Sequence, residues 1–437
     1  MLLKNKYIMS TKIKIQTAGR YQLILAFIAF MSFSFSMNLN AQSKAYHEYK
    51  GKVIDENTGQ PLSFATISVK GTNIATVTNA DGEFILKVPK NKSGNDLLIS
   101  YIGYKSKNVP INSLNTKKNK IKLELLSVSL AEINIFPKDA KLLMQAVLSR
   151  RKENYMQYPA LMTAFYRETI KKRRTYASLA EAVIQIYKQP YKNVFSDQVR
   201  LLKARKKADY SRLDTMVFKL MGGPYNCLVL DIMKSPNLMI SYESMDYYDF
   251  TFDNITRIND RLIYVISFKQ KKAIDEPLPY GKLYIDSESL AITKAVFNIN
   301  TENKEEVSKM FIKKKPAGAN VYIMNATYMV NYREVDGVWY FGHSRGEMTV
   351  KVDWDKKFFN TTYTAQFELA VTDWHKADEN STIKPKYRIK KNIIMRDQDT
   401  GFTDKDFWGA YNVIEPEKPI ENAIKKIQKN LKKLNNK

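Results

Sequence analysis

The sequence predicts a mainly β protein, and three observations carry that prediction. Alternating apolar and polar residues recur along most of the chain. Turn residues such as Asn, Asp and Gly separate these runs at short intervals. Helical periodicity stands out in only two segments, one near residue 140 and one at the C-terminus. The expected order is a small β-sandwich, a linker helix, a larger antiparallel β domain that could curve into a half-barrel, and a C-terminal amphipathic helix.

Composition narrows the class of protein. The chain has 437 residues, 44% of them hydrophobic, which is the content of a globular protein and suggests two or three domains. Its single cysteine excludes a disulfide framework and a cysteine-rich metal centre. With three scattered histidines, no multi-histidine metal site and no cofactor are expected.

Residues 1–41 have the features of a signal peptide. The first 20 residues carry five basic side chains and no acid, and the apolar run QLILAFIAFMSF follows at 22–33. A small residue, Ala41, offers a cleavage point before Gln42. A retained membrane anchor is the alternative, but the run is shorter than the roughly 20 residues that a spanning helix needs. We expect an exported protein, periplasmic or associated with the outer membrane, that is neither an integral helical membrane protein nor a lipoprotein, since no cysteine lies near the cleavage point.

Residues 46–126 predict the β-sandwich. The runs ATISV (65–69), EFILKV (83–88) and IKLEL (121–125) each place apolar residues at every second position. Turn pairs such as Lys70-Gly71 and Asp81-Gly82 lie between the runs. Short strands at this spacing are typical of a sandwich.

The same residues resemble the carboxypeptidase-regulatory-like (transthyretin-like) domain. The resemblance implies a structural or interaction accessory without peptidase activity, of the kind found at the N-termini of exported Gram-negative proteins, including TonB-dependent receptors. The matching positions are Gly51, Val53, Asp55, Thr58, Pro61, Leu62, Ala65, Val69, Gly71, Thr72, Thr78, Asp81, Gly82, Phe84, Ile99, Tyr101, Gly103 and Tyr104.

Residues 127–159 predict a linker. The segment SLAEINI (129–135) looks like a short strand, and Asp139 can cap the helix that follows. The expected apolar face of this helix comprises Leu142, Leu143, Ala146 and Val147. Pro159 ends the linker.

Residues 160–415 predict long antiparallel strands joined by tight turns, one of them at Asp336-Gly337. Residues 210–245 are harder to interpret and suggest a helix or an irregular lid. The segments GKLYIDSESLAITKAVF (281–297) and REVDGVWYFGHSR (333–345) belong to a long series of strands and turns. Through them the region 240–375 resembles half-barrels of the lipoprotein-carrier type, and that resemblance implies a curved sheet around an apolar concavity. The candidate ligand-binding residues on it are Tyr322, Met324, Tyr328 and Val330, which alternate along one predicted strand. The alternative is that they pack in an ordinary core.

No catalytic motif stands out. His47, His343 and His375 lack the spacing of a zinc carboxypeptidase, and no GxSxG or phosphate-binding loop is present. The apolar neighbours of Cys227 indicate a buried, inert thiol. Acid pairs such as Glu305 with Glu306, and Asp246 with Asp249, resemble surface acids more than a glycosidase pair.

The net charge of +26 is the most unusual feature of the composition. The tail 416–437 predicts a basic amphipathic helix that could lie on an anionic membrane surface or dock on a partner. Lysine-rich solvated faces are the alternative, and export makes nucleic acid an unexpected partner. The apolar side of this helix would consist of Ile420, Ile424, Ile427, Leu431 and Leu434.

These observations favour a non-enzymatic protein of the cell envelope. Its β-rich domain would bind an apolar ligand, such as a lipid, or an envelope protein. The alternatives from other classes are an envelope glycan-acting enzyme of unrecognised class and a structural or interaction module.

Overall fold

A computed structural model describes residues 45–92, 94–116, 118–126, 139–208, 221–235, 240–258, 261–312, 318–355, 360–378, 381–395 and 407–425. The predicted signal peptide with Ala41 and Gln42, and the predicted strand 129–135, lie outside these residues. Residues 46–437 form one compact unit. Among the described residues, no helix has the length and apolar character needed to cross a membrane.

The predicted β-sandwich is confirmed. One sheet has the order β4 (Glu83–Pro89), β1 (Tyr46–Asp55), β7 (Asn119–Leu123). The other has the order β3 (Ala75–Val77), β2 (Thr66–Val69), β5 (Leu97–Ser100), β6 (Lys107–Val109). The predicted inward residues, among them Ile67, Phe84 and Leu123, form its core. Leu125, at the end of the run 121–125, is the exception, because it follows the end of β7 and is exposed.

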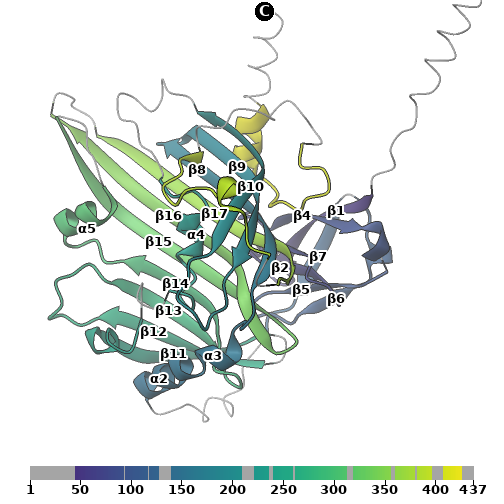
Figure 1. The fold of residues 1–437 in the computed structure, drawn as a ribbon, viewed down its shortest axis with the longest axis horizontal. Helices are drawn as coiled ribbons and strands as arrows, with labels where there is room; N and C mark the ends of the chain where they lie inside the picture. The colour runs from purple at the N-terminus through teal and green to yellow at the C-terminus, as the bar shows by residue number, and fades with distance from the viewer. Residues whose placement is uncertain are drawn as a thin grey trace, which may run out of the picture. The chain divides into compact units, whose positions relative to one another are not determined.

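A single ten-stranded antiparallel sheet is the largest element of the fold (Figure 1). Its edge strands are β10 and β11, which do not pair, so the sheet is not closed into a barrel. In spatial order the strands are β10 (Gln198–Ala208), β9 (Thr175–Lys188), β8 (Ala160–Lys172), β17 (Thr361–Lys376), β16 (Val338–Trp354), β15 (Ala319–Val335), β14 (Ile292–Ile299), β13 (Pro279–Asp286), β12 (Arg261–Gln270) and β11 (Tyr248–Ile258).

The two faces of this sheet have different coverings. We call one the core face, because alternate side chains such as Tyr166, Ala182 and Leu369 belong to the main hydrophobic core there. Helix α2 (Ala140–Ser149) and helix α4 (Tyr225–Leu228) contribute to the same core. The remaining short helices are α3 (Arg151–Asn154), α5 (Lys304–Phe311), η1 (Lys90–Lys92), η2 (Ile111–Ser113), η5 (Met245–Tyr247) and η6 (Pro385–Tyr387).

Helix α2 begins as predicted, but its buried face differs from the prediction. The Asp139 carboxylate accepts hydrogen bonds from the backbone N–H groups of Lys141 and Leu142, which makes it the N-cap. Leu142 is exposed, whereas Met144 is buried. The stripe that faces the core runs through Ala140, Leu143, Met144, Val147 and Leu148, which places Leu142 outside it.

The opposite face, which we call the sandwich face, is covered by both ends of the described chain. Val77 and Ile85 of the sandwich share a hydrophobic cluster with Phe165 of the large sheet and with Trp408 of the C-terminal segment. Asn412 anchors that segment, because its side-chain amide exchanges two hydrogen bonds with the backbone of Lys87, at 2.6 and 2.9 Å. The sandwich is therefore built into the same unit as the sheet.

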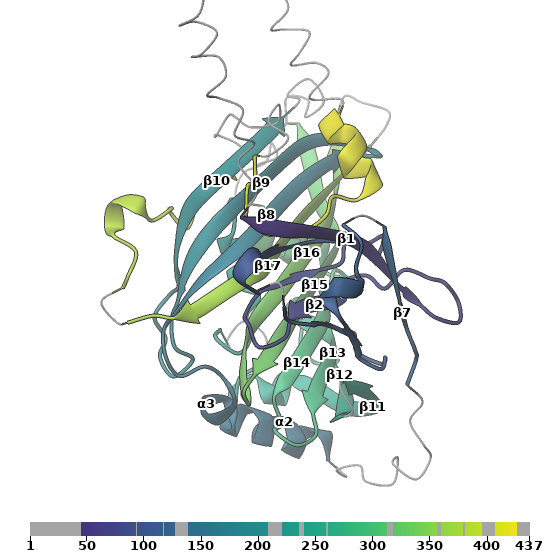
Figure 2. The same ribbon diagram turned by 90° about the vertical axis from the view of Figure 1, so that its right-hand side faces the viewer.

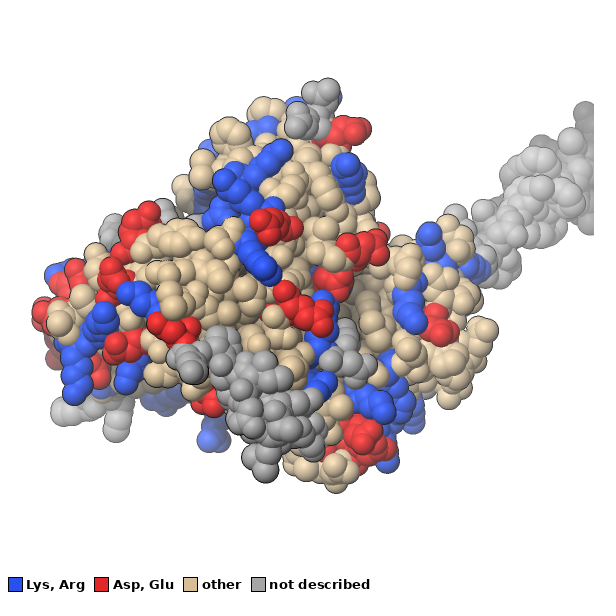
Figure 3. All heavy atoms as spheres, turned by 90° about the horizontal axis from the view of Figure 1, so that it is seen from below, with Lys and Arg blue, Asp and Glu red and all other residues tan. Residues whose placement is uncertain are grey.

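The C-terminal helix is confirmed over 418–425, and the rest of the predicted helix lies outside the described residues. Its first apolar residues, Ile420 and Ile424, are buried against Leu179 of β9. Figure 2 shows this helix, in yellow, beside the large sheet. On the view in Figure 3, basic side chains lie in patches among acidic ones and do not form a continuous coat.

A substitution at Gly51 tests how closely the β-sandwich is packed. A Cβ atom there would lie 2.7 Å from the Phe84 ring and 2.6 Å from the backbone oxygen of Asn119. We expect Gly51→Ala to lower the free energy of unfolding by about 2 kcal/mol, since overpacking shifts backbone as well as side chains. Urea denaturation measures this. Gly94→Ala, at a position with open space around it, is the matched control; equal effects of the two substitutions would contradict the packing argument.

Candidate functional site

An aromatic strip on the core face is the candidate ligand site. Paired positions place Phe297 of β14 beside Tyr328 of β15, then Gly346 of β16 and Phe367 of β17. The ring centroids of Phe297 and Tyr328 are 5.4 Å apart, and those of Tyr328 and Phe367 are 6.4 Å apart. Because Gly346 has no side chain, the Phe367 ring can lie across it. The four residues form a continuous apolar strip across four strands.

Tyr328 adds one polar atom to this strip. The side chain is largely buried, and its hydroxyl has no hydrogen-bond partner among the residues that the structure describes. Burial raises the pKa of this phenol, so it stays protonated at neutral pH and keeps its O–H as a donor. This O–H can donate to an acceptor that comes to lie beside it.

The predicted ligand-binding residues do not all share one face. Tyr328 and Val330 lie on the core face and are part of the main core. A β-bulge between Ile323 and Asn325 places one extra residue, Met324, in the strand. The bulge shifts the alternation by one position, so Tyr322 lies on the sandwich face and Met324 is exposed in the bulge. The expectation that the four share a face is therefore wrong for Tyr322 and Met324.

The segment that the sequence left uncertain contributes to the core in its described parts, 221–235 and 240–245. Cys227, Leu228 and Met233 belong to the same core as Tyr328 and Val330. Cys227 is fully buried, and burial raises the pKa of its thiol well above the ordinary range. This is the inert environment that the sequence predicts for it.

A buried charge network holds this segment against the sheet. The Lys188 ammonium at the end of β9 donates to Asp197 at 2.8 Å and to Asp231 at 2.7 Å. Asp231 also accepts hydrogen bonds from the hydroxyls of Tyr191 and Tyr332, each at 2.8 Å. Both carboxylates and the ammonium are thus paired, which is the condition under which such charges are tolerated inside a protein.

A row of alternating charges crosses the sandwich face. The order over five neighbouring strands is Arg205, Glu181, Arg167, Glu368, Arg345, each residue paired in register with the next. The Arg167 guanidinium lies 2.7 Å from Glu181 and 3.1 Å from Glu368, and all three side chains are buried. Burial opposes the charge of Arg167, but these two carboxylates outweigh it and raise its pKa. We call these five residues the charge row.

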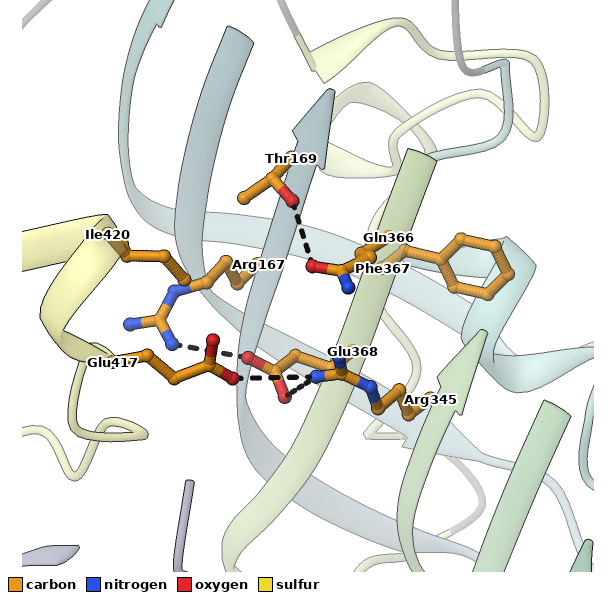
Figure 4. A pocket seen from close by; sticks show the side chains of 8 residues that line it. All are labelled: Arg167, Thr169, Arg345, Gln366, Phe367, Glu368, Glu417 and Ile420. Atoms are coloured by element: carbon orange, nitrogen blue, oxygen red, sulfur yellow. Dashed lines mark hydrogen bonds and ion pairs between the residues drawn. The ribbon is translucent and has the colours of Figure 1, made fainter. Parts of the chain in front are cut away.

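The C-terminal segment covers the charge row and leaves a pocket there. The backbone oxygen of Ile414 accepts a hydrogen bond from Arg167 at 2.9 Å. Glu417 lies 3.9 Å from Arg345, and Figure 4 shows these carboxylates and guanidinium groups turned toward one another. The pocket is small, with a volume of about 10 Å³. The charged groups that line it are already paired with one another or with neighbouring side chains.

The other residues considered for catalysis do not come together in one site. His343 is buried on the sandwich face, where its ring stacks on Phe64 at 5.5 Å between centroids. Glu305 and Glu306 lie on the exposed side of α5, and Asp246 forms an ion pair with Lys141. Among the described residues, no group of three or more His, Cys, Asp or Glu side chains is arranged to hold a metal ion.

Sequence reasoning missed the charge row, although a signal for it exists. Arg167, Glu181 and Glu368 each lie in the middle of a strand that is otherwise largely apolar: AFYRETI, SLAEAVI and AQFELAV. A charge at such a position needs a partner, because the strand around it is buried.

Removing the central arginine tests the charge row. We expect Arg167→Met to lower the free energy of unfolding by about 3 kcal/mol, because Glu181 and Glu368 lose a buried partner. Urea denaturation measures the change. The control is Lys309→Met, which removes an exposed ion pair with Glu306 and should have no measurable effect. A similar stability for wild type and Arg167→Met would show that the row does not contribute.

The buried His343 side chain should make the stability of the protein depend on pH. Burial lowers its pKa from 6.5 to about 4, with Arg345 and Lys294 adding to the effect and Glu368 opposing it. Between these pH values the unfolded chain binds a proton that the folded protein does not, so stability falls as the pH falls through this window. We expect His343→Gln to remove about 3 kcal/mol of this fall. Denaturation midpoints of both proteins at pH 4 to 7 test this, and parallel curves would contradict it.

Comparisons with known proteins identify the N-terminal domain. Residues 49–135 match the family model of the CarboxypepD_reg-like domain. The chain is 33% identical over 127 residues to TonB-dependent receptor P39 of Formosa agariphila, which is 29% of this chain and 12% of the receptor. It is 36% identical over 59 residues to TonB-dependent receptor SusC of Bacteroides thetaiotaomicron, which is 14% of this chain and 6% of that one.

Two solved structures have a distant similarity to this chain. A lipovitellin structure titled for its lipid–protein interactions aligns with 53% of this chain and 27% of its own, at 9% identity and a TM-score of 0.27. A DUF1329 family protein from Desulfovibrio piger aligns with 53% of this chain and 92% of its own, at 10% identity and a TM-score of 0.20. The chain spans a small part of the receptors that it matches, and the shared domain fits a β-rich protein of the cell envelope.

Proposed function

We propose that this is an exported protein of the periplasm or outer membrane that binds a lipid-like ligand on the core face of its large sheet. It acts by binding and not by catalysis. The ligand class is an acyl chain with a hydrogen-bond acceptor. The observation that carries the proposal is the Tyr328 hydroxyl, which has no partner among the described residues and lies within an aromatic strip.

The chemistry of the strip supports this ligand class. Phe297 and Phe367 surround Tyr328 with apolar side chains that are buried in the core, at 2% and 7% exposure. A chain of methylene groups that entered this core would gain about 0.8 kcal/mol for each group buried. The protonated Tyr328 hydroxyl can donate to a carboxylate or ester oxygen of the same molecule. Gly346 has no side chain, so the Phe367 ring can lie over its backbone and no other side chain stands between Tyr328 and Phe367.

Lipid binding can be measured on the mature full-length protein. We expect lipid to co-purify and to be detected by mass spectrometry after organic extraction. We also expect saturable uptake of a fluorescent fatty acid. Tyr328→Phe should weaken that uptake about fivefold, since it removes one hydrogen bond and keeps the ring.

Tyr322→Phe is the matched control, because it removes a hydroxyl from the same strand on the sandwich face. Its affinity for the fatty acid should equal that of the wild type. The absence of both lipid and uptake would refute the proposed function. Equal losses in the two variants would refute the assignment of Tyr328.

A further inference from the structure

Two exposed apolar side chains form the tip of the loop between β9 and β10. Val194 is 93% exposed and Phe195 is 66% exposed. An isolated exposed apolar residue needs no explanation, but two consecutive ones at the tip of a loop are unusual. Their exposed apolar surface is available for contact with another molecule.

The base of this loop is fixed, so the tip is held outward. Lys188 and Asp197 form a buried ion pair across the two ends of the loop, at 2.8 Å. The Lys234 ammonium donates to the backbone oxygens of Pro190 and Asn193, at 2.7 and 2.6 Å. These bonds hold the loop in place from inside, and they leave Val194 and Phe195 in solvent.

A second exposed loop, residues 384–388, begins beside the first. Its flanking residues are tied to the start of β10, since the Ile383 N–H donates to the side chain of Gln198 and the Ile389 N–H donates to the backbone oxygen of Val199. Arg388 closes the base of the loop by donating to the oxygen of Ile383 at 2.6 Å. Tyr387 within it is 52% exposed. The loop contains the η6 turn, which projects at the left of Figure 2.

The two loops carry the same sign of charge. Lys391 joins them, because its ammonium lies 2.7 Å from the Ser196 hydroxyl. Residues 189–196 and 381–395 contain no acid, and Asp197 is buried in its pair with Lys188. The exposed basic residues are Lys192, Lys384, Lys386, Arg388, Lys390 and Lys391. With Val194, Phe195 and Tyr387 they form what we call the two-loop patch.

We propose that the two-loop patch docks the protein on an anionic lipid bilayer. Exposed Val194 and Phe195 can enter the headgroup region, Tyr387 suits the interface, and the six cations match negative headgroups. The C-terminal helix is the rival site, but Ile420 and Ile424 on its apolar side are already buried against β9. This proposal is independent of ligand binding on the core face.

A fluorescent label at the loop tip tests the proposal on the full mature protein. Because Cys227 is fully buried, Val194→Cys introduces one reactive thiol for an environment-sensitive dye. We expect the fluorescence to rise with phosphatidylglycerol–phosphatidylcholine vesicles and not with phosphatidylcholine alone. Met310→Cys, an exposed position on α5, is the control and should show no rise.

Sedimentation with the same vesicles separates the apolar and ionic contributions. We expect Val194→Ser with Phe195→Ser, and separately Lys386→Glu with Lys391→Glu, to reduce the bound fraction about tenfold each. Lys105→Glu with Lys120→Glu on the sandwich is the charge control. Wild-type binding by both patch variants, or binding lost only when residues 418–437 are deleted, would overturn the proposal. No binding of the wild type to anionic vesicles would also overturn it.

Discussion

The charge row is the constraint on which the arrangement of the large sheet depends. Arg167 is buried between Glu181 and Glu368, and each of those carboxylates has a second arginine on its far side. Buried charges are tolerated only when they are paired, so each strand must meet its neighbour in this register. A slip of one residue would turn the charges toward the core face and leave them unpaired. The row thus favours one relative position for each of the five strands.

Burial of the charge row requires a cover, and both ends of the described chain supply it. The sandwich and the C-terminal segment meet through Lys87 and Asn412, and the segment then contacts Arg167 through the oxygen of Ile414. The CarboxypepD_reg-like domain is therefore more than an appended module, because its strands help to exclude water from the sheet. The sequence similarity to the receptors covers this domain. The position of the domain in this protein is determined by its packing against the large sheet.

Local sequence patterns predict the strands. Which residues of those strands lie together in the candidate site depends on how the strands pair. Alternation is a property of neighbouring residues, so the runs around Ile67 and Val330 were readable from the sequence. The bulge at Met324 exists only relative to β16, and no local signal marks it. Likewise, Arg167 and Glu368 are 201 residues apart, so their odd charges are visible in the sequence while their partnership is not. The unpartnered Tyr328 hydroxyl also depends on what packs around it.

Lys188 links the two surfaces to which we assign functions. Its ammonium pairs with Asp197, which fixes the base of the exposed loop, and with Asp231, which belongs to the segment packed on the core face. Tyr332, on the same strand and face as Tyr328, donates to Asp231 as well. One buried ammonium therefore anchors both the base of the exposed loop and the segment that packs on the core face.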